Sequence, residues 1–170
     1  MSLKNVILQN KWLIGATSAA LIAGATYWEG VRYAPYYDVA GVPTVCMGYT
    51  GPGITFGKRY SHEECTKLLK QELIEHGNGV LSCITRPMKE NEYNAFTLMA
   101  YNIGVQAFCG SQAAKQFNLG NTKLACDLIA FDYKGYPNWS YAGGKFYKGL
   151  HNRRLYERTM CLGDANVYKS

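Results

Sequence analysis

Residues 27–51 read YWEGVRYAPYYDVAGVPTVCMGYTG, and this stretch differs in composition from the rest of the chain. It is rich in tyrosine, valine, threonine and glycine, and two prolines interrupt it. This composition favours short strands that are joined by tight turns. The stretch also contains Glu29 and Asp38, the only carboxylates before Tyr60. The sequence therefore predicts a small β lobe that carries two acidic side chains.

The residues after this stretch show helical patterns. Ser61 and Glu64 form a capping box that predicts a helix start, and Gly77 is the expected end of that helix. Residues 90–103 are apolar nearly all round, which predicts a buried central helix that ends near Gly104. Further helices are expected over residues 111–119, 122–131 and 153–162, with a loop over residues 133–150. The fold class is then α+β and mostly α, with a small β-hairpin lobe, a helical lobe and an intervening cleft.

Composition and charge exclude several classes of protein. The chain has 170 residues and a net charge of +6, and 14% of its residues are aromatic. This aromatic content, with only 18% charged residues, excludes a disordered acidic or basic tail protein. The length fits one domain, or a small domain with a tail. Basic residues are densest between positions 134 and 158, which indicates either a solvated face or a contact with a polyanion. No helix-turn-helix, zinc-finger or RNA-binding signature accompanies them, so nucleic acid is not an expected partner.

The N-terminal part of the chain contains an uncharged run from Trp12 to Trp28, preceded by Lys4 and Lys11. The run is at the lower limit for a helix that spans a bilayer, and its glycines, serine and threonines make it only weakly apolar. Basic residues before it predict that the rest of the chain is exported. Three interpretations remain open: a secretory signal cleaved at residues 23–25, an uncleaved anchor, and a buried helix of a cytosolic protein.

The cysteines indicate the cellular compartment in which the protein folds. The six cysteines all follow the uncharged run: Cys46, Cys65, Cys83, Cys109, Cys126 and Cys161. There is no CxxC spacing and no HExxH motif, so a metal centre is not expected. An even number of cysteines after an export-like N-terminus indicates three disulfides in an oxidising compartment, with 15 possible connectivities. Six buried thiols in a cytosolic core are the alternative.

Glu29 and Asp38 are the candidate catalytic pair. Cleavage of a polysaccharide needs one acid that protonates the leaving oxygen and one carboxylate that activates water or attacks. Thr44 follows the turn after Asp38, and a hairpin would return its hydroxyl to the side of Asp38, where it could help to hold a water. Each of these residues alone has a simpler explanation. Glu29 could be a solvated helix end, Asp38 a turn residue and Thr44 a packed strand position.

The spacing of Glu29, Asp38 and Thr44 resembles the catalytic signature of the phage lysozymes of glycoside hydrolase family 24. Residues 101–104 (YNIG) resemble the end of the central helix of that family, and residues 139–154 resemble its C-terminal motif. The resemblance covers nearly the whole chain.

The resemblance implies a lysozyme-like fold and hydrolysis of the β-1,4 bond between N-acetylmuramic acid and N-acetylglucosamine in peptidoglycan. Glu29 would donate the proton, and Asp38 and Thr44 would position and activate a water, with inversion at the anomeric carbon. No cofactor is implied, and a monomer is expected. One departure is visible, because Tyr49 stands where family members commonly carry histidine.

The N-terminal run resembles the signal-anchor-release segment of endolysins from phages of Gram-negative hosts. Such segments are not cleaved; they hold the enzyme inactive in the inner membrane until the membrane potential collapses. The resemblance implies a segment over residues 1–28 and a catalytic domain over residues 29–170, first at the host inner membrane facing the periplasm and then free in the periplasm. It also implies three disulfides: Cys46–Cys65, Cys83–Cys109 and Cys126–Cys161.

Two other functions stay open at this point. A cell-wall or polyanion binding module with an inactive site could use the basic residues between positions 134 and 158. A lytic transglycosylase could use the same fold and leave an anhydro end without adding water.

Overall fold

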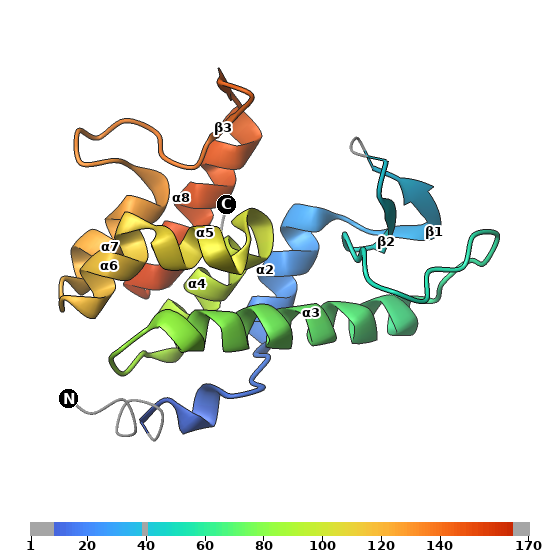
Figure 1. The fold of residues 1–170 in the computed structure, drawn as a ribbon, viewed down its shortest axis with the longest axis horizontal. Helices are drawn as coiled ribbons and strands as arrows, with labels where there is room; N and C mark the ends of the chain where they lie inside the picture. Colours follow the sequence, from blue (N-terminus) through green and yellow to red (C-terminus); the bar gives the residue numbers. More distant parts are fainter. Residues whose placement is uncertain (1–8, 39–40, 165–170) are drawn as a thin grey trace.

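The computed structural model describes residues 9–38 and 41–164. A β lobe and a helical lobe share one long helix, α3, which runs beneath both (Figure 1). The elements follow in the order η1 (Lys11–Leu13), α2 (Ala19–Glu29), β1 (Arg32–Tyr37), β2 (Pro43–Cys46), α3 (His62–Cys83), α4 (Glu90–Ile103), α5 (Val105–Gly110), α6 (Gln112–Asn118), α7 (Thr122–Ala130), β3 (Tyr141–Ala142), β4 (Lys145–Phe146) and α8 (Lys148–Leu162). The predicted fold class, α+β and mostly α with a small β-hairpin lobe, is confirmed.

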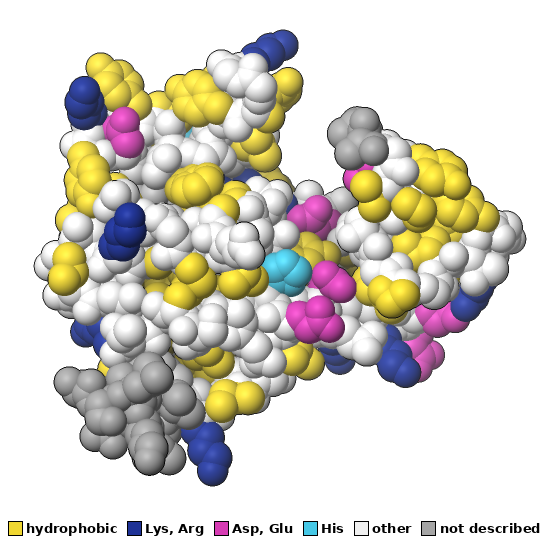
Figure 2. All heavy atoms as spheres, in the orientation of Figure 1, with side chains coloured by type: hydrophobic (Ala, Val, Ile, Leu, Met, Phe, Trp, Pro, Cys, Tyr) yellow, Lys and Arg dark blue, Asp and Glu magenta, His cyan; other side chains and the backbone are white. Residues whose placement is uncertain are grey.

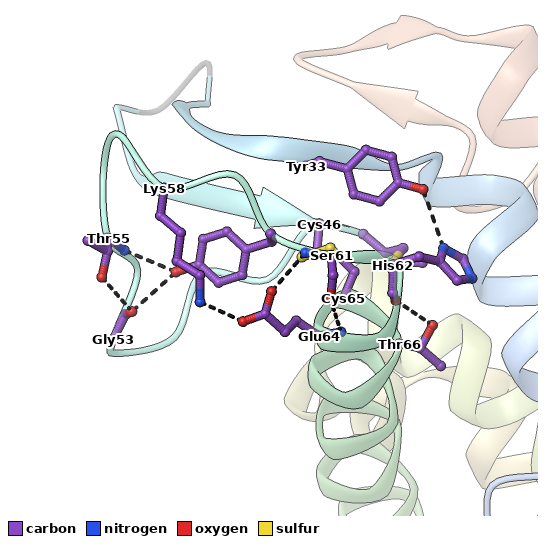
Figure 3. Close-up of a disulfide and its surroundings, with 12 residues drawn as sticks. Tyr33, Cys46, Gly53, Thr55, Lys58, Ser61, His62, Glu64, Cys65 and Thr66 are labelled. Carbon is purple, nitrogen blue, oxygen red and sulfur yellow. Dashed lines mark hydrogen bonds and ion pairs between the residues drawn. A yellow bond between two sulfur atoms is a disulfide. The ribbon is translucent and has the colours of Figure 1, made fainter.

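The β lobe is a short antiparallel hairpin of β1 and β2, as the composition of residues 27–51 predicts. A disulfide between Cys46 and Cys65 ties the end of β2 to the first turn of α3 (Figure 3). In the same region Ser61 accepts the Glu64 backbone N–H while the Glu64 carboxylate accepts the Ser61 N–H, so the predicted capping box is confirmed. The hairpin is thus fixed to the helix that carries both lobes.

The expected end of α3 at Gly77 is wrong. The helix continues through Gly77 and Gly79 to Cys83. A Cβ atom at Gly77 would overlap the hydroxyl of Tyr93, and a Cβ atom at Gly79 would overlap the side chain of Val105. These glycines therefore allow α4 and α5 to pack closely on α3, and they do not end the helix.

Helix α4 forms the centre of the helical lobe, with the bounds that the sequence predicts. It ends at Gly104, whose positive φ of 90° suits a residue without a Cβ atom. Most of its side chains are buried. Its fully or nearly fully buried apolar residues are Tyr93, Ala95, Phe96, Leu98, Met99 and Ala100. The helix is apolar nearly all round because other helices pack against it on every side: α2, α3, α5 and α8.

The C-terminal part differs from the prediction in two ways. Residues 133–150, expected to be a loop, contain the small hairpin of β3 and β4. Helix α8 begins at Lys148, before the expected start at residue 153. Both strands of the hairpin have only two residues, and all four side chains are exposed. No alternation of buried and exposed residues is therefore available to mark them.

Three disulfides join the described elements, with the pairing that the family resemblance implies. Besides the bond from β2 to α3, Cys83–Cys109 joins the end of α3 to α5, and Cys126–Cys161 joins α7 to α8. Loops of this length stabilise a fold by about 3–4 kcal/mol each in the chain-entropy account.

The described part of the uncharged N-terminal run packs against the helical lobe. Leu13, Leu21 and Ala25 are fully buried. Ser18 caps α2 by accepting the Leu21 N–H, and it also accepts a hydrogen bond from the side chain of Asn94 on α4. Residues 1–8 of the predicted segment lie outside the described residues. Among those described, no helix has both the length and the apolarity needed to cross a bilayer.

Leu21→Ala should lower the free energy of unfolding by about 2–5 kcal/mol, because it leaves a cavity between α2 and the core. Ile14→Ala is the matched control. Ile14 lies in the same uncharged run but is 54% exposed, so its loss should cost less than about 0.5 kcal/mol. Urea unfolding of the soluble protein measures both. Equal effects would contradict the docking of this run into the core.

Candidate active site

Glu29 is the last residue of α2, where the chain leaves the helix for the β lobe. Gly30 follows with a positive φ of 64° and directs the chain into β1. The Glu29 side chain is 22% exposed, and its Oε1 atom accepts a hydrogen bond of 2.6 Å from Nη1 of Arg153. The acid is thus open to a ligand on one side and held by a guanidinium group on the other.

A buried network of charges lies behind Glu29. Arg153 also donates from Nε to Oε1 of Glu157 at 3.1 Å. The same oxygen accepts Nη2 of Arg154 at 2.8 Å, and that Nη2 donates further to Oδ1 of Asn102 at 3.0 Å. The side chains of Arg153, Arg154 and Glu157 are at most 5% exposed. Two arginines and two glutamates therefore balance one another inside the protein.

Burial shifts the pKa values in this network. Removal from water raises the pKa of Glu157, and the neighbouring positive charge of Arg154 opposes that rise. Burial likewise lowers the pKa of Arg154, against the opposing effect of Glu157. Each charge is tolerated because the opposite charge lies within hydrogen-bonding distance.

The role of these arginines is not predicted from the sequence, where they form part of a basic stretch. Arg153 and Arg154 are internal, and Arg158 forms an ion pair with Asp127 at 2.6 Å. Of the basic residues between positions 134 and 158, the exposed ones are Lys134, Lys145 and Lys148. The signal was present in the sequence, because Glu157 follows the two arginines at helical spacings of four and three residues.

Asp38 and Thr44 lie on either side of the turn in the β hairpin. The Val42 N–H donates to Oδ1 of Asp38 at 2.8 Å. The Val42 carbonyl accepts both the Asp38 N–H at 3.0 Å and the Thr44 hydroxyl at 2.9 Å. The backbone N–H and carbonyl of one residue, Val42, therefore hold both side chains, in the hairpin that the sequence predicts. Thr44 is buried and Asp38 is half-buried.

The wall beside Glu29 is formed by a turn of the β lobe and by the end of α4. A Cβ atom at Gly48 would lie 3.6 Å from Oε2 of Glu29, so the backbone passes close to the acid. The Tyr101 hydroxyl donates to the Met47 carbonyl at 2.7 Å. Tyr49, at the position where the family resemblance implies a histidine, directs its hydroxyl to the Pro52 carbonyl at 3.0 Å.

Acidic side chains and a histidine gather where the surface is hollowed between the two lobes (Figure 2). The charges of Glu29 and Glu72 both act on Tyr101, and the His76 ring lies edge-on to the Tyr101 ring at 5.1 Å. Burial raises the pKa of Glu72, and the neighbouring His76 opposes that rise. Among residues 9–38 and 41–164, no group of three or more histidine, cysteine, aspartate or glutamate side chains could hold a metal ion.

This arrangement suits acid–base chemistry on a polymer. A partly exposed carboxylate faces the hollow from the helical lobe, and a carboxylate and a hydroxyl are presented together by the β lobe. Such a pair can protonate a leaving oxygen and hold a water for attack.

The chain is similar to phage lysozymes in both sequence and fold. The sequence model of the phage lysozyme family matches residues 26–157. A SAR-endolysin of Bacteriophage PS119 is 42% identical over 79% of this chain and 76% of its own length. A SAR-endolysin of Pseudomonas phage phiKMV is 36% identical over 95% of this chain and 98% of its own. The crystal structure of a P22 lysozyme mutant superposes with a TM-score of 0.75 and 32% identity, covering 85% of this chain and 97% of that one.

Glu157→Gln should lower the free energy of unfolding by about 3–5 kcal/mol, because two buried guanidinium groups would then have only Glu29 to compensate them. Asp127→Asn is the matched control. Asp127 also binds two cations, Lys123 and Arg158, but its side chain is 26% exposed, so its loss should cost less than about 1 kcal/mol. Urea unfolding at neutral pH compares the two. Similar costs would contradict a structural role for the buried network.

Proposed function

Because the chain belongs to the phage lysozyme family, we propose that it is an endolysin that hydrolyses the β-1,4 bond between N-acetylmuramic acid and N-acetylglucosamine, with Glu29 as the proton donor. It is a glycoside hydrolase that acts on bacterial peptidoglycan. The observation that carries the assignment of Glu29 is its position: a partly exposed carboxylate at the junction of the two lobes, held by Arg153 at 2.6 Å.

The reaction needs one proton and one water. Glu29 protonates the glycosidic oxygen as the bond to the anomeric carbon breaks. A water held by Asp38 and Thr44 attacks that carbon from the opposite face and gives up a proton to the Asp38 carboxylate, so the configuration inverts. The product is a pair of shorter glycans, one with a new reducing end.

The hydrogen bonds in the hairpin support the role of Thr44. Its hydroxyl proton is already donated to the Val42 carbonyl. Its oxygen can therefore act as an acceptor toward a water, which leaves a lone pair of that water directed away from the hairpin. Asp38 is fixed by the backbone of the same residue, Val42, so the two groups keep a constant geometry.

We further propose that the N-terminal segment anchors the enzyme in the host inner membrane, facing the periplasm, and leaves the bilayer without cleavage. Two observations support this. The match to the phiKMV SAR-endolysin covers 95% of this chain. Cleavage after Ala25 would remove Leu13, Leu21 and the Ser18 cap from the folded enzyme, all of which contribute to its packing.

Glu29→Gln should slow the clearing of purified peptidoglycan by at least about 100-fold, because the amide keeps the shape of the side chain but cannot donate the proton. Glu63→Gln, at an exposed position in the first turn of α3, is the control and should clear as the wild type does. Turbidity measures the rate, and circular dichroism confirms the fold.

Each alternative has its own result in this assay. Near wild-type clearing by Glu29→Gln would overturn the role of Glu29. A wild-type protein that sediments with peptidoglycan without clearing it would instead be a binding module. Products that lack the mass of an added water would identify a lytic transglycosylase.

Release from the membrane is tested in a Gram-negative host that expresses the full chain. Collapse of the membrane potential should move protein of full-length mass from the membrane fraction to the periplasm. A variant with Gly15→Leu and Gly24→Leu should stay in the membrane, because its segment is more apolar. A shorter soluble protein, cleaved near Ala25 before the collapse, would contradict the proposal.

A further inference from the structure

We propose that Tyr101 is a positioning residue, whose hydroxyl fastens the Met47–Gly48 turn of the β lobe to the helical lobe and so holds that turn against Glu29. The inference rests on the proposed function, because it concerns the geometry around the proton donor.

The contact joins two distant parts of the chain. Tyr101 lies in the last turn of α4, and its hydroxyl donates to the carbonyl of Met47, the residue after β2, at 2.7 Å. Met47 itself is only 2% exposed. Water therefore has little access to replace this hydrogen bond if the hydroxyl is removed.

The turn that receives this bond is short and closed. Val45 and Tyr49 exchange two backbone hydrogen bonds of 2.9 Å each. Between them Cys46 and Gly48 have positive φ values of 60° and 86°. Cys46 is not a glycine, so its conformation costs free energy that the surrounding contacts must supply. A displacement of any part of this turn moves the rest of it.

The same turn borders the acid and the tyrosine. A Cβ atom at Gly48 would lie 3.6 Å from Oε2 of Glu29 and 3.9 Å from the Tyr101 hydroxyl. The backbone at Gly48 is therefore close to both the Glu29 carboxylate and the Tyr101 hydroxyl. The Tyr101 bond fixes how closely the backbone approaches the carboxylate.

Two attachments then hold the turn, one to each supporting helix. The disulfide of Cys46 with Cys65 ties it to α3 (Figure 3), and the hydroxyl of Tyr101 ties it to α4. The disulfide fixes the side of the turn next to β2. Without the hydroxyl, the side next to Glu29 loses its link to the helical lobe.

Tyr101 is suited to this role because it remains a donor. Burial raises the pKa of its hydroxyl well above the ordinary value, and the negative charges of Glu29 and Glu72 raise it further. The ring is restrained by the edge contact with His76, whose Nδ1 is 2.7 Å from the Glu72 carbonyl.

The test removes one hydroxyl at each of two positions on α4. Tyr101→Phe should lower kcat on purified peptidoglycan oligomers by about tenfold and leave KM within about twofold, because the reacting groups lose alignment while substrate contacts remain. Tyr93→Phe is the matched control. The Tyr93 hydroxyl also donates to a backbone carbonyl, that of Ala16 at 3.4 Å, on the side of the N-terminal segment. Its kcat should equal that of the wild type.

Amide hydrogen exchange gives a second measurement that does not depend on activity. The Tyr49 amide should exchange faster in Tyr101→Phe than in the wild type, and should be unchanged in Tyr93→Phe. An unchanged kcat in Tyr101→Phe, or equal losses in both variants, would overturn the proposal. A wild-type protein without turnover, or an active Glu29→Gln, would instead overturn the proposed function.

Discussion

The arrangement of helices α2, α4 and α8 depends on the ion pair between Glu29 and Arg153. It joins the end of α2 to α8, and the arginine is in turn held by Glu157 and by the Leu98 carbonyl of α4. Charges this deeply buried are tolerated only when opposite charges meet them, so the three helices must pack in one arrangement. The acid that faces the hollow is therefore fixed by the core of the helical lobe.

This constraint couples the N-terminal segment to the site. Helix α2 carries the buried Leu21 and Ala25, and it ends in Glu29. The carboxylate can reach Arg153 only when α2 is docked, because the two features belong to one rigid element. On the proposed release mechanism, a chain whose α2 residues are in a bilayer cannot complete this ion pair, and docking supplies the proton donor.

The sequence predicts the parts of the fold that local patterns determine. The hairpin, the capping box at Ser61 and the central helix follow from turn composition, capping and periodicity. The extension of α3 past Gly77 was not predictable, because the reason lies in the Tyr93 ring on another helix. The spacing of Glu29, Asp38 and Thr44 located the proposed site, whereas the contributions of Arg153 and Tyr101 depend on contacts between residues far apart in the chain.

The configuration of the first product shows from which side of the sugar the water attacks. Proton nuclear magnetic resonance during early digestion of peptidoglycan oligomers reports the anomer of the new N-acetylmuramic acid end before mutarotation equilibrates it. Water attack opposite to Glu29, from the side of Asp38 and Thr44, predicts that the α anomer appears first. A β anomer, or an anhydro end without added water, would contradict inverting attack by a water that Asp38 and Thr44 hold.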